Sequence, residues 1–177
     1  MSDNLSRRRY LAGTGAALTI GTLAGCSGGG DGGDGGDGGD GSDGSDGSGG
    51  GNAAEDVPDE IDEYLSDARM YEGTIMDFTG QDEVTVEVGA GDVGFAFSPA
   101  AIRIDSSTTV VWEWTGNGGA HNVASVEGSE SDFNSGDAVS EEGATFEQSF
   151  DNTGIQLYQC TPHQANGMLG AIEVVEA

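Results

Sequence analysis

The sequence contains no lysine, and its basic residues are five arginines: Arg7, Arg8, Arg9, Arg69 and Arg103. The chain of 177 residues carries 32 acidic side chains, so its formal net charge is −27. A surface of this sign repels phosphate, which excludes nucleic acid as a natural partner. No run of about 18 uninterrupted apolar residues occurs, which excludes a membrane protein with several spans.

The excess of carboxylates favours adaptation to very high salt over an acidic surface that only confers solubility. At 1 M salt the Debye length is about 3 Å, so repulsion among the carboxylates is largely screened. In dilute buffer the same charges destabilise the compact state. We therefore expect the melting temperature to rise between dilute and multimolar KCl.

Residues 1–25 have the pattern of an export signal and are set aside from the fold. The hexapeptide 6–11 (Ser-Arg-Arg-Arg-Tyr-Leu) resembles a twin-arginine signal, and a short apolar stretch follows it. Residues 23–26 (Leu-Ala-Gly-Cys) resemble the cleavage box of lipoproteins, in which Cys26 becomes the lipidated N-terminus. The alternative is an uncleaved N-terminal membrane helix. Both interpretations place the rest of the chain on the outer face of the cell membrane.

The segment 26–51 is predicted to be a disordered linker. After Cys26 it contains only glycine, aspartate and serine, with an aspartate at every third position from Asp31 to Asp46. Such a segment has no apolar surface to bury, and it lacks the apolar position that calcium-binding nonapeptide repeats require. It therefore serves as a tether between the membrane anchor and a folded domain.

The folded part begins with a predicted short amphipathic helix in residues 52–70 and continues with strands. The apolar residues of the helix recur at helical spacing, and Asp56 is expected to cap it with Pro58 in the first turn. From residue 71 the apolar period changes to two. The predicted strands are 74–78, 84–88, 95–97, 102–104, 110–114, 121–126, 144–150, 155–160 and 169–175. So many short strands with so little helix indicate an all-β antiparallel sandwich or barrel.

One stretch between the last two predicted strands has the pattern of a metal site. Cys160 and His163 are separated by two residues, and Met168 follows after four more. A thiolate, imidazoles and a distant thioether form the ligand set that selects copper and supports one-electron transfer. The second imidazole must come from His121, because the chain contains two histidines.

Other interpretations of these residues remain open at this point. Zinc also accepts one cysteine and two histidines, although a thioether is a poor zinc ligand. Cys160 could be a buried thiol or could pair with Cys26. The two histidines could be ordinary surface residues, and Met168 could belong to the core.

Residues 90–177 resemble the cupredoxins of the plastocyanin kind, and they are most similar to the halocyanins, blue copper proteins of halophilic archaea. The resemblance rests on five segments: 97–99 (Phe-Ser-Pro), 109–114 (Thr-Val-Val-Trp-Glu-Trp), 119–123 (Gly-Ala-His-Asn-Val), 143–146 (Gly-Ala-Thr-Phe) and the motif 160–168. It implies a Greek-key β-sandwich and makes residues 71–177 a copper-binding domain.

The resemblance also implies the roles of individual residues. His121, Cys160 and His163 become the strong ligands of one type 1 copper ion, and Met168 becomes its weak axial ligand. Asn122 is expected to join the two ligand-bearing loops by hydrogen bonding to Thr161. Such bonds orient metal ligands and tune the reduction potential.

The sequence thus predicts a mobile electron carrier that cycles between Cu(I) and Cu(II), and not an enzyme. His163 is the expected electron port, within a small uncharged patch formed by Gly119, Ala120, Pro162, Gly167 and Leu169. The expected partners of the protein are membrane-bound respiratory or other redox proteins, which the protein meets transiently as a monomer. The alternatives are a surface lipoprotein that binds or delivers copper without redox duty, and a structural or adhesion lipoprotein.

Overall fold

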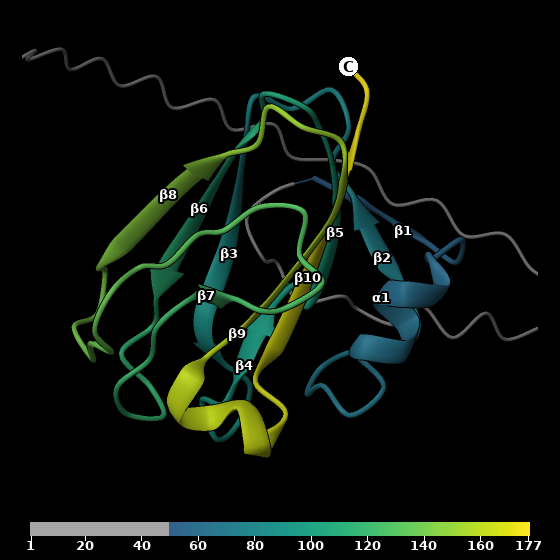
Figure 1. The fold of residues 1–177 in the computed structure, drawn as a ribbon. Coiled ribbons are helices and arrows are strands. Elements are labelled where there is room, and N and C mark those ends of the chain that lie inside the picture. The colour runs from purple at the N-terminus through teal and green to yellow at the C-terminus, as the bar shows by residue number, and fades with distance from the viewer. Residues whose placement is uncertain (1–49) are drawn as a thin grey trace, which may run out of the picture. The chain divides into compact units, whose positions relative to one another are not determined.

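The computed structural model describes residues 50–177 (Figure 1). The predicted export signal 1–25, the predicted lipidation site Cys26 and the linker up to residue 49 lie outside the described residues. Within 50–177 the structure contains no helix that is both long and apolar enough to cross a membrane.

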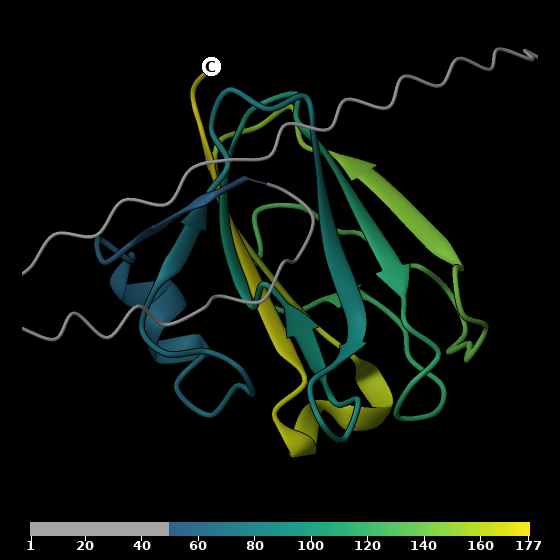
Figure 2. The same ribbon diagram turned by 180° about the vertical axis from the view of Figure 1, so that it is seen from behind.

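Two β-sheets pack face to face in the described part of the chain (Figures 1 and 2). The first sheet has the strand order β1-β2-β5-β10-β9-β7 and the second has the order β4-β3-β6-β8. The strands are β1 (Asn52–Ala54), β2 (Ile75–Asp77), β3 (Glu83–Ala90), β4 (Ala96–Ser98), β5 (Ala101–Asp105), β6 (Thr109–Trp114), β7 (Ala124–Ser125), β8 (Thr145–Ser149), β9 (Gly154–Gln159) and β10 (Leu169–Val175). The C-terminus lies at the end of the sandwich opposite the loop between β9 and β10 (Figures 1 and 2).

The core between the sheets is formed by the inward-facing residues that alternate along each strand. Trp112 is fully buried near its centre, with ring centroids 5.4 Å from Tyr158 and 5.5 Å from Phe146. Cys160 and Met168 belong to the same cluster of buried side chains. The copper-site motif therefore lies at the edge of a rigid aromatic core.

The predicted sandwich is confirmed, but its sheets are mixed and not purely antiparallel. Each of the nine predicted strands corresponds to an observed one, and β1 is an additional strand. Three strand pairs run parallel: β3 with β6, β5 with β10, and β2 with β5. An alternating pattern indicates which residues face the core, whereas the direction of a neighbouring strand depends on how the connections cross between sheets.

The predicted helix is present as α1 (Asp59–Tyr64), but the range 52–70 was too long, since residues 52–54 form β1, and the prediction for the helix N-terminus was wrong. Pro58 occupies the capping position, and no side chain caps the helix. The Asp56 carboxylate instead lies 3.2 Å from the Arg103 guanidinium. Ile61 and Leu65 are fully buried in a second apolar cluster, which attaches α1 to the outer side of the six-stranded sheet.

Candidate metal centre

Three side chains that are far apart in the sequence meet at one end of the sandwich. His121 lies between β6 and β7, Cys160 directly follows β9, and His163 lies in the 3₁₀ helix η1 (Thr161–Asn166). The Nδ1 atoms of the two histidines are 3.1 Å apart, and Cys160 Sγ lies 3.6 Å from His121 Nδ1 and 3.5 Å from His163 Nδ1. All three potential ligand atoms therefore face one point.

The ring of His121 is oriented by a hydrogen bond on its far side. Its Nε2 lies 2.7 Å from the Asn117 carbonyl oxygen, and a carbonyl can only accept, so Nε2 carries the proton. This leaves the Nδ1 lone pair directed at Cys160. Burial lowers the pKa of His121, and the neighbouring His163 lowers it further, while the bond to Asn117 opposes the shift. The neutral ring that results is the form that binds a metal.

The backbone of His121 is fixed as firmly as its ring. Trp114 donates from Nε1 to the His121 carbonyl at 3.0 Å, and His121 exchanges two backbone hydrogen bonds with Val139. Val139 belongs to the acidic segment 127–142, which lies between His121 and Cys160 in the sequence. This segment thus supports the backbone of His121.

Gly89 allows a close backbone approach to the His121 site that the sequence did not reveal. It has a φ of +89° at a bulge in β3, where the register with β4 shifts. A Cβ atom here would lie 2.7 Å from the Asn117 oxygen and 3.3 Å from His121 Nε2. A glycine is therefore required beside the bond that orients His121.

The segment from Cys160 to Met168, here called the ligand loop, closes on itself. The Cys160 amide donates to the Met168 carbonyl at 3.0 Å, and the Met168 amide donates to the His163 carbonyl at 3.3 Å. Gly167 ends the 3₁₀ helix in the left-handed conformation, with a φ of +80°. Burial raises the pKa of the Cys160 thiol, and hydrogen bonds from backbone amides oppose the shift. Cys160 is a free cysteine.

Met168 is fully buried at the end of the ligand loop, in the same apolar cluster as Cys160. The sequence left open whether Met168 belongs to the core. A buried side chain at this end of the loop can be both a core residue and a metal ligand. Its backbone lies against both Cys160 and His163 through the two hydrogen bonds just described.

Asn122 and Thr161 are in direct contact. The Asn122 Oδ1 atom accepts from the Thr161 amide at 2.8 Å, and its Nδ2 lies 3.3 Å from the Thr161 hydroxyl. These bonds join the segment after His121 to the segment after Cys160. The structure therefore brings together all six of the predicted site residues it describes.

Phe95 is a site residue that sequence reasoning missed, because its spacing only indicated a strand. Phe95 directly precedes β4, and its ring stacks on the ring of His163, with the centroids 4.3 Å apart and the planes at 22°. His163 is partly exposed, whereas His121 is completely buried. The stacked ring restricts how the His163 imidazole can turn while one edge still reaches the surface.

The surface around His163 differs from the predicted patch in two residues. Gly119, Ala120 and Pro162 are exposed. Gly167 is buried, and Leu169 is only partly exposed because it packs against the cluster beneath α1. Leu169 therefore contributes to the attachment of α1 rather than to an open surface.

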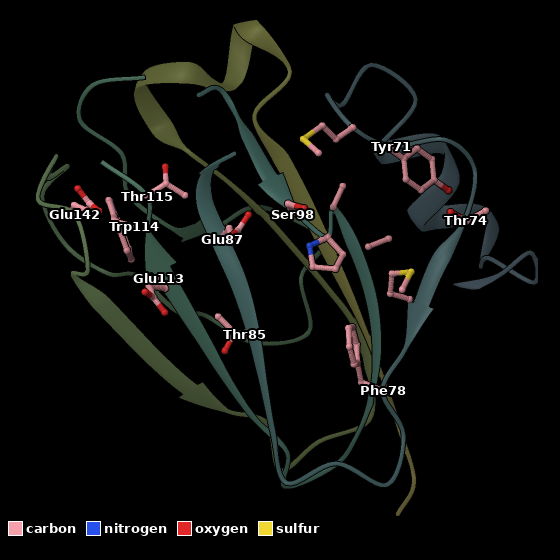
Figure 3. Close-up of a pocket in the computed structure, with 15 residues that line it drawn as sticks. Tyr71, Thr74, Phe78, Thr85, Glu87, Ser98, Glu113, Trp114, Thr115 and Glu142 are labelled. Atoms are coloured by element: carbon pink, nitrogen blue, oxygen red, sulfur yellow. The ribbon is translucent and has the colours of Figure 1, made fainter. Parts of the chain in front are cut away.

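A groove of about 600 Å³ lies elsewhere, across the outer face of β3 and β6 and beside β2 (Figure 3). Its labelled acidic residues are Glu87, Glu113 and Glu142, and Trp114 forms part of one wall (Figure 3). None of the predicted metal ligands lines it. The groove is therefore separate from the cluster of His121, Cys160 and His163.

The donor atoms of this cluster fit copper. One sulfur and two imidazole nitrogens lie within 4.8 Å of one another, and a buried thioether side chain belongs to the same loop. Soft sulfur with imidazole is the donor set of blue copper sites. In the part of the chain that the structure describes, no other group of three histidine, cysteine or acidic residues has its ligand atoms close enough together to hold a metal ion.

Comparison with known proteins agrees with this donor set. The sequence profile described as "Copper binding proteins, plastocyanin/azurin family" matches residues 83–175. The chain is 57% identical to the halocyanin of Natronomonas pharaonis over 97% of this chain and 98% of that protein. It is 33% identical to the plastocyanin of Scenedesmus fuscus over 52% of this chain and 99% of that protein. Among solved structures, a mutant fern plastocyanin matches 52% of this chain and 100% of its own, with 25% identity and a TM-score of 0.44.

Proposed function

This chain belongs to the plastocyanin/azurin family of copper-binding proteins, and from this premise we propose that it is a membrane-tethered mobile electron carrier. It is a blue copper protein related to halocyanin over nearly its whole length. The observation that carries the proposal is the convergence of Cys160 Sγ with the Nδ1 atoms of His121 and His163.

His121, Cys160 and His163 are the proposed strong ligands, and Met168 is the proposed weak axial ligand. Bound copper supplies a one-electron couple between Cu(I) and Cu(II). The protein holds the ligands in one geometry so that little rearranges between the two states. The bond from His121 to Asn117, the stacking of Phe95 on His163 and the Asn122–Thr161 bonds serve this purpose.

The number of histidines favours an electron carrier over a redox enzyme with a second metal centre. The chain has two histidines, and both belong to the one cluster. A second metal with histidine ligands therefore has no imidazoles available. The single centre suits outer-sphere transfer to a partner, and the partly exposed His163 is the proposed electron port.

The first experiment is to add Cu(II) to the full chain in multimolar KCl and record a visible spectrum. We expect an intense thiolate-to-copper band that ascorbate bleaches and an oxidant restores. A folded protein that binds Cu(II) without this band would contradict the proposal and favour the alternative, a lipoprotein that binds or delivers copper. A carrier of that kind must release its metal, so rapid loss of copper to a chelator would also favour it.

The electron port can be tested with Ala120→Asp. Ala120 is exposed and directly precedes His121 in the chain, so the new charge would enter the surface through which a partner approaches. We expect slower electron exchange with a small or protein partner in multimolar KCl, where charge steering at long range is screened. The control is Ala53→Asp, the same substitution at an exposed residue of β1. Equal rates in the two variants would contradict the port.

The axial position can be tested with Met168→Gln. An amide oxygen is a harder ligand than a thioether and stabilises Cu(II) relative to Cu(I). We expect the variant to retain copper and its blue colour but to have a lower reduction potential, measured by redox titration. An unchanged potential would show that Met168 acts only as a core residue.

The proposed location is the outer face of the cell membrane. A lipid on Cys26 and the linker that follows would hold the domain near membrane-bound respiratory or other redox partners and raise its effective concentration there. The protein would meet these partners transiently as a monomer. Detergent-phase partitioning of the exported protein, lost in Cys26→Ser, would support the anchor.

A further inference from the structure

The ligand loop is contacted at both ends by a segment that precedes the copper-binding part of the chain. This segment, residues 59–70, consists of α1 and the turn after it, and here it is called the N-terminal support. It lies outside residues 83–175, which carry the family match. The turn after α1 ends beside the 3₁₀ helix of the ligand loop in both views (Figures 1 and 2).

Three hydrogen bonds connect the support to the ligand segment. The Tyr64 hydroxyl donates to the carbonyl of Tyr158 at 2.9 Å, two residues before Cys160. Arg69 donates from its amide to the Gly167 carbonyl at 2.8 Å and from Nε to the Asn166 carbonyl at 2.7 Å. The bonds from Arg69 end one and two residues before Met168. The support therefore holds the chain on both sides of the proposed ligands.

The contact at Gly167 has little room for movement. A Cβ atom on Gly167 would lie 2.5 Å from the Asp67 carbonyl oxygen, so the two backbones are closely packed. No residue within the 3₁₀ helix itself is buried, and Phe95 contacts this helix by stacking on His163. The hydrogen bonds from Arg69 add a second restraint at the C-terminal end of the loop.

The support itself is firmly attached to the two strands that lead into and out of the ligand loop. Ile61 and Leu65 are fully buried in a cluster with Leu157 of β9 and Ala171 of β10. A shift of the support relative to these strands would break this packing. Tyr64 and Arg69 thus extend from a fixed base.

We propose that the N-terminal support positions the copper ligands, with Tyr64 and Arg69 as its two positioning residues. The inference rests on the proposed copper site, because it concerns the geometry of that site. Neither residue is a ligand. Each acts by fixing a backbone carbonyl one or two residues from a ligand, so that the thiolate, imidazole and thioether keep their relative positions when the copper changes its oxidation state.

The first test measures amide hydrogen exchange in the metal-free full chain and so does not depend on copper chemistry. The observed amides are those of His163, Gly167 and Met168, which donate within the ligand loop. We expect Arg69→Met and Tyr64→Phe each to reduce their protection about three- to tenfold, the effect of one lost hydrogen bond. Arg69→Lys keeps a donor and the charge and should restore part of the protection.

The matched control is Tyr71→Phe. The Tyr71 hydroxyl donates to Asp62 of the support at 2.8 Å, so the substitution removes a bond to the support that does not reach the ligand loop. We expect it to leave the protection of the loop unchanged. If Arg69→Met and Tyr64→Phe behave like Tyr71→Phe, the proposal is overturned.

The second test distinguishes positioning from a general structural role. In Cu(II)-loaded protein at multimolar KCl, Arg69→Met should change the relative intensities of the thiolate-to-copper bands and speed the loss of copper to a chelator. Tyr71→Phe should change neither. Wild-type spectra in both Arg69→Met and Tyr64→Phe would refute the positioning role. If the wild-type protein shows no blue band but its loop protection depends on Arg69, the proposed function fails while the contact with the support stands.

Discussion

Cys160→Ser is expected to abolish the blue absorption of the copper-loaded protein completely. The intense band requires a thiolate bonded to Cu(II), and a serine hydroxyl keeps its proton and is a hard, weak ligand for copper. The fold should persist, because serine is slightly smaller than cysteine and the buried side chains packed around position 160 are unchanged. The measurement is a visible spectrum at saturating Cu(II), with circular dichroism to verify the fold.

The chain offers a matched control for this substitution. Cys26→Ser makes the same replacement at the other cysteine, which lies in the predicted lipidation box. We expect Cys26→Ser to keep the full blue band. A blue band in Cys160→Ser that equals the wild type would show that the thiolate ligand has been assigned to the wrong residue, and the copper site would have to be reconsidered.

Arg103→Met is expected to lower the free energy of unfolding by about 2–4 kcal/mol. Arg103 lies on β5 in register with Asp77 on β2 and Glu173 on β10, and its side chain is 13% exposed. The guanidinium donates from Nε to Glu173 at 2.6 Å and lies 3.6 Å from Asp77 and 3.2 Å from Asp56. Removing it leaves three carboxylates close together with no cation between them. Urea denaturation in dilute buffer measures the effect.

Three further measurements separate the charge effect from loss of packing. Multimolar KCl should reduce the cost of Arg103→Met, because it screens the repulsion that remains among the carboxylates. The double variant Arg103→Met with Glu173→Met should recover part of the lost stability, since an apolar pair can replace an ion pair. Arg69→Met removes the same charge from an exposed position and should cost about 1 kcal/mol or less. A cost for Arg103→Met that is equally small would show that the network contributes little.

The pKa of Asp77 adds a dependence on pH to the same network. A hydrogen bond from the Thr79 amide is the largest cause that lowers this pKa, and the charge of Arg103 lowers it further. A carboxyl whose pKa is lower in the folded state stabilises the fold at neutral pH, and this contribution disappears as the pH falls through the folded-state value. The stability that depends on Arg103 and Asp77 should therefore be lost only in acid.

The metal ligands could be recognised from the sequence because most of them are close together in it. Cys160, His163 and Met168 lie within one loop, and the one remaining histidine had to complete the set. The strands could be recognised for a similar reason, since alternation along a strand is a local property of the chain. The burial of Trp112 and Ile172 follows from that alternation.

The errors and omissions concern contacts between residues that are distant in the sequence. Asp56 looked like a helix cap, but the fold brings Arg103 to it and the ion pair prevails. Leu169 looked like part of an open patch, but α1 packs against its side of the sheet. Phe95 looked like a strand residue, but the loop before β4 carries its ring onto His163.

The sequence by itself indicated an all-β sandwich or barrel and four candidate copper ligands, because spacing and residue type are local properties of the chain. The resemblance to the cupredoxins favoured the sandwich over the barrel and copper over zinc. Only the tertiary structure decided which way the strands run, how Asn117 and Gly89 orient His121, and that α1 and the turn after it hold the ligand loop. The strand directions depend on how the connections cross between the sheets, and the other features depend on carbonyl oxygens and on backbone atoms in close approach. Every residue has such atoms, so their roles arise only when the fold brings the segments together.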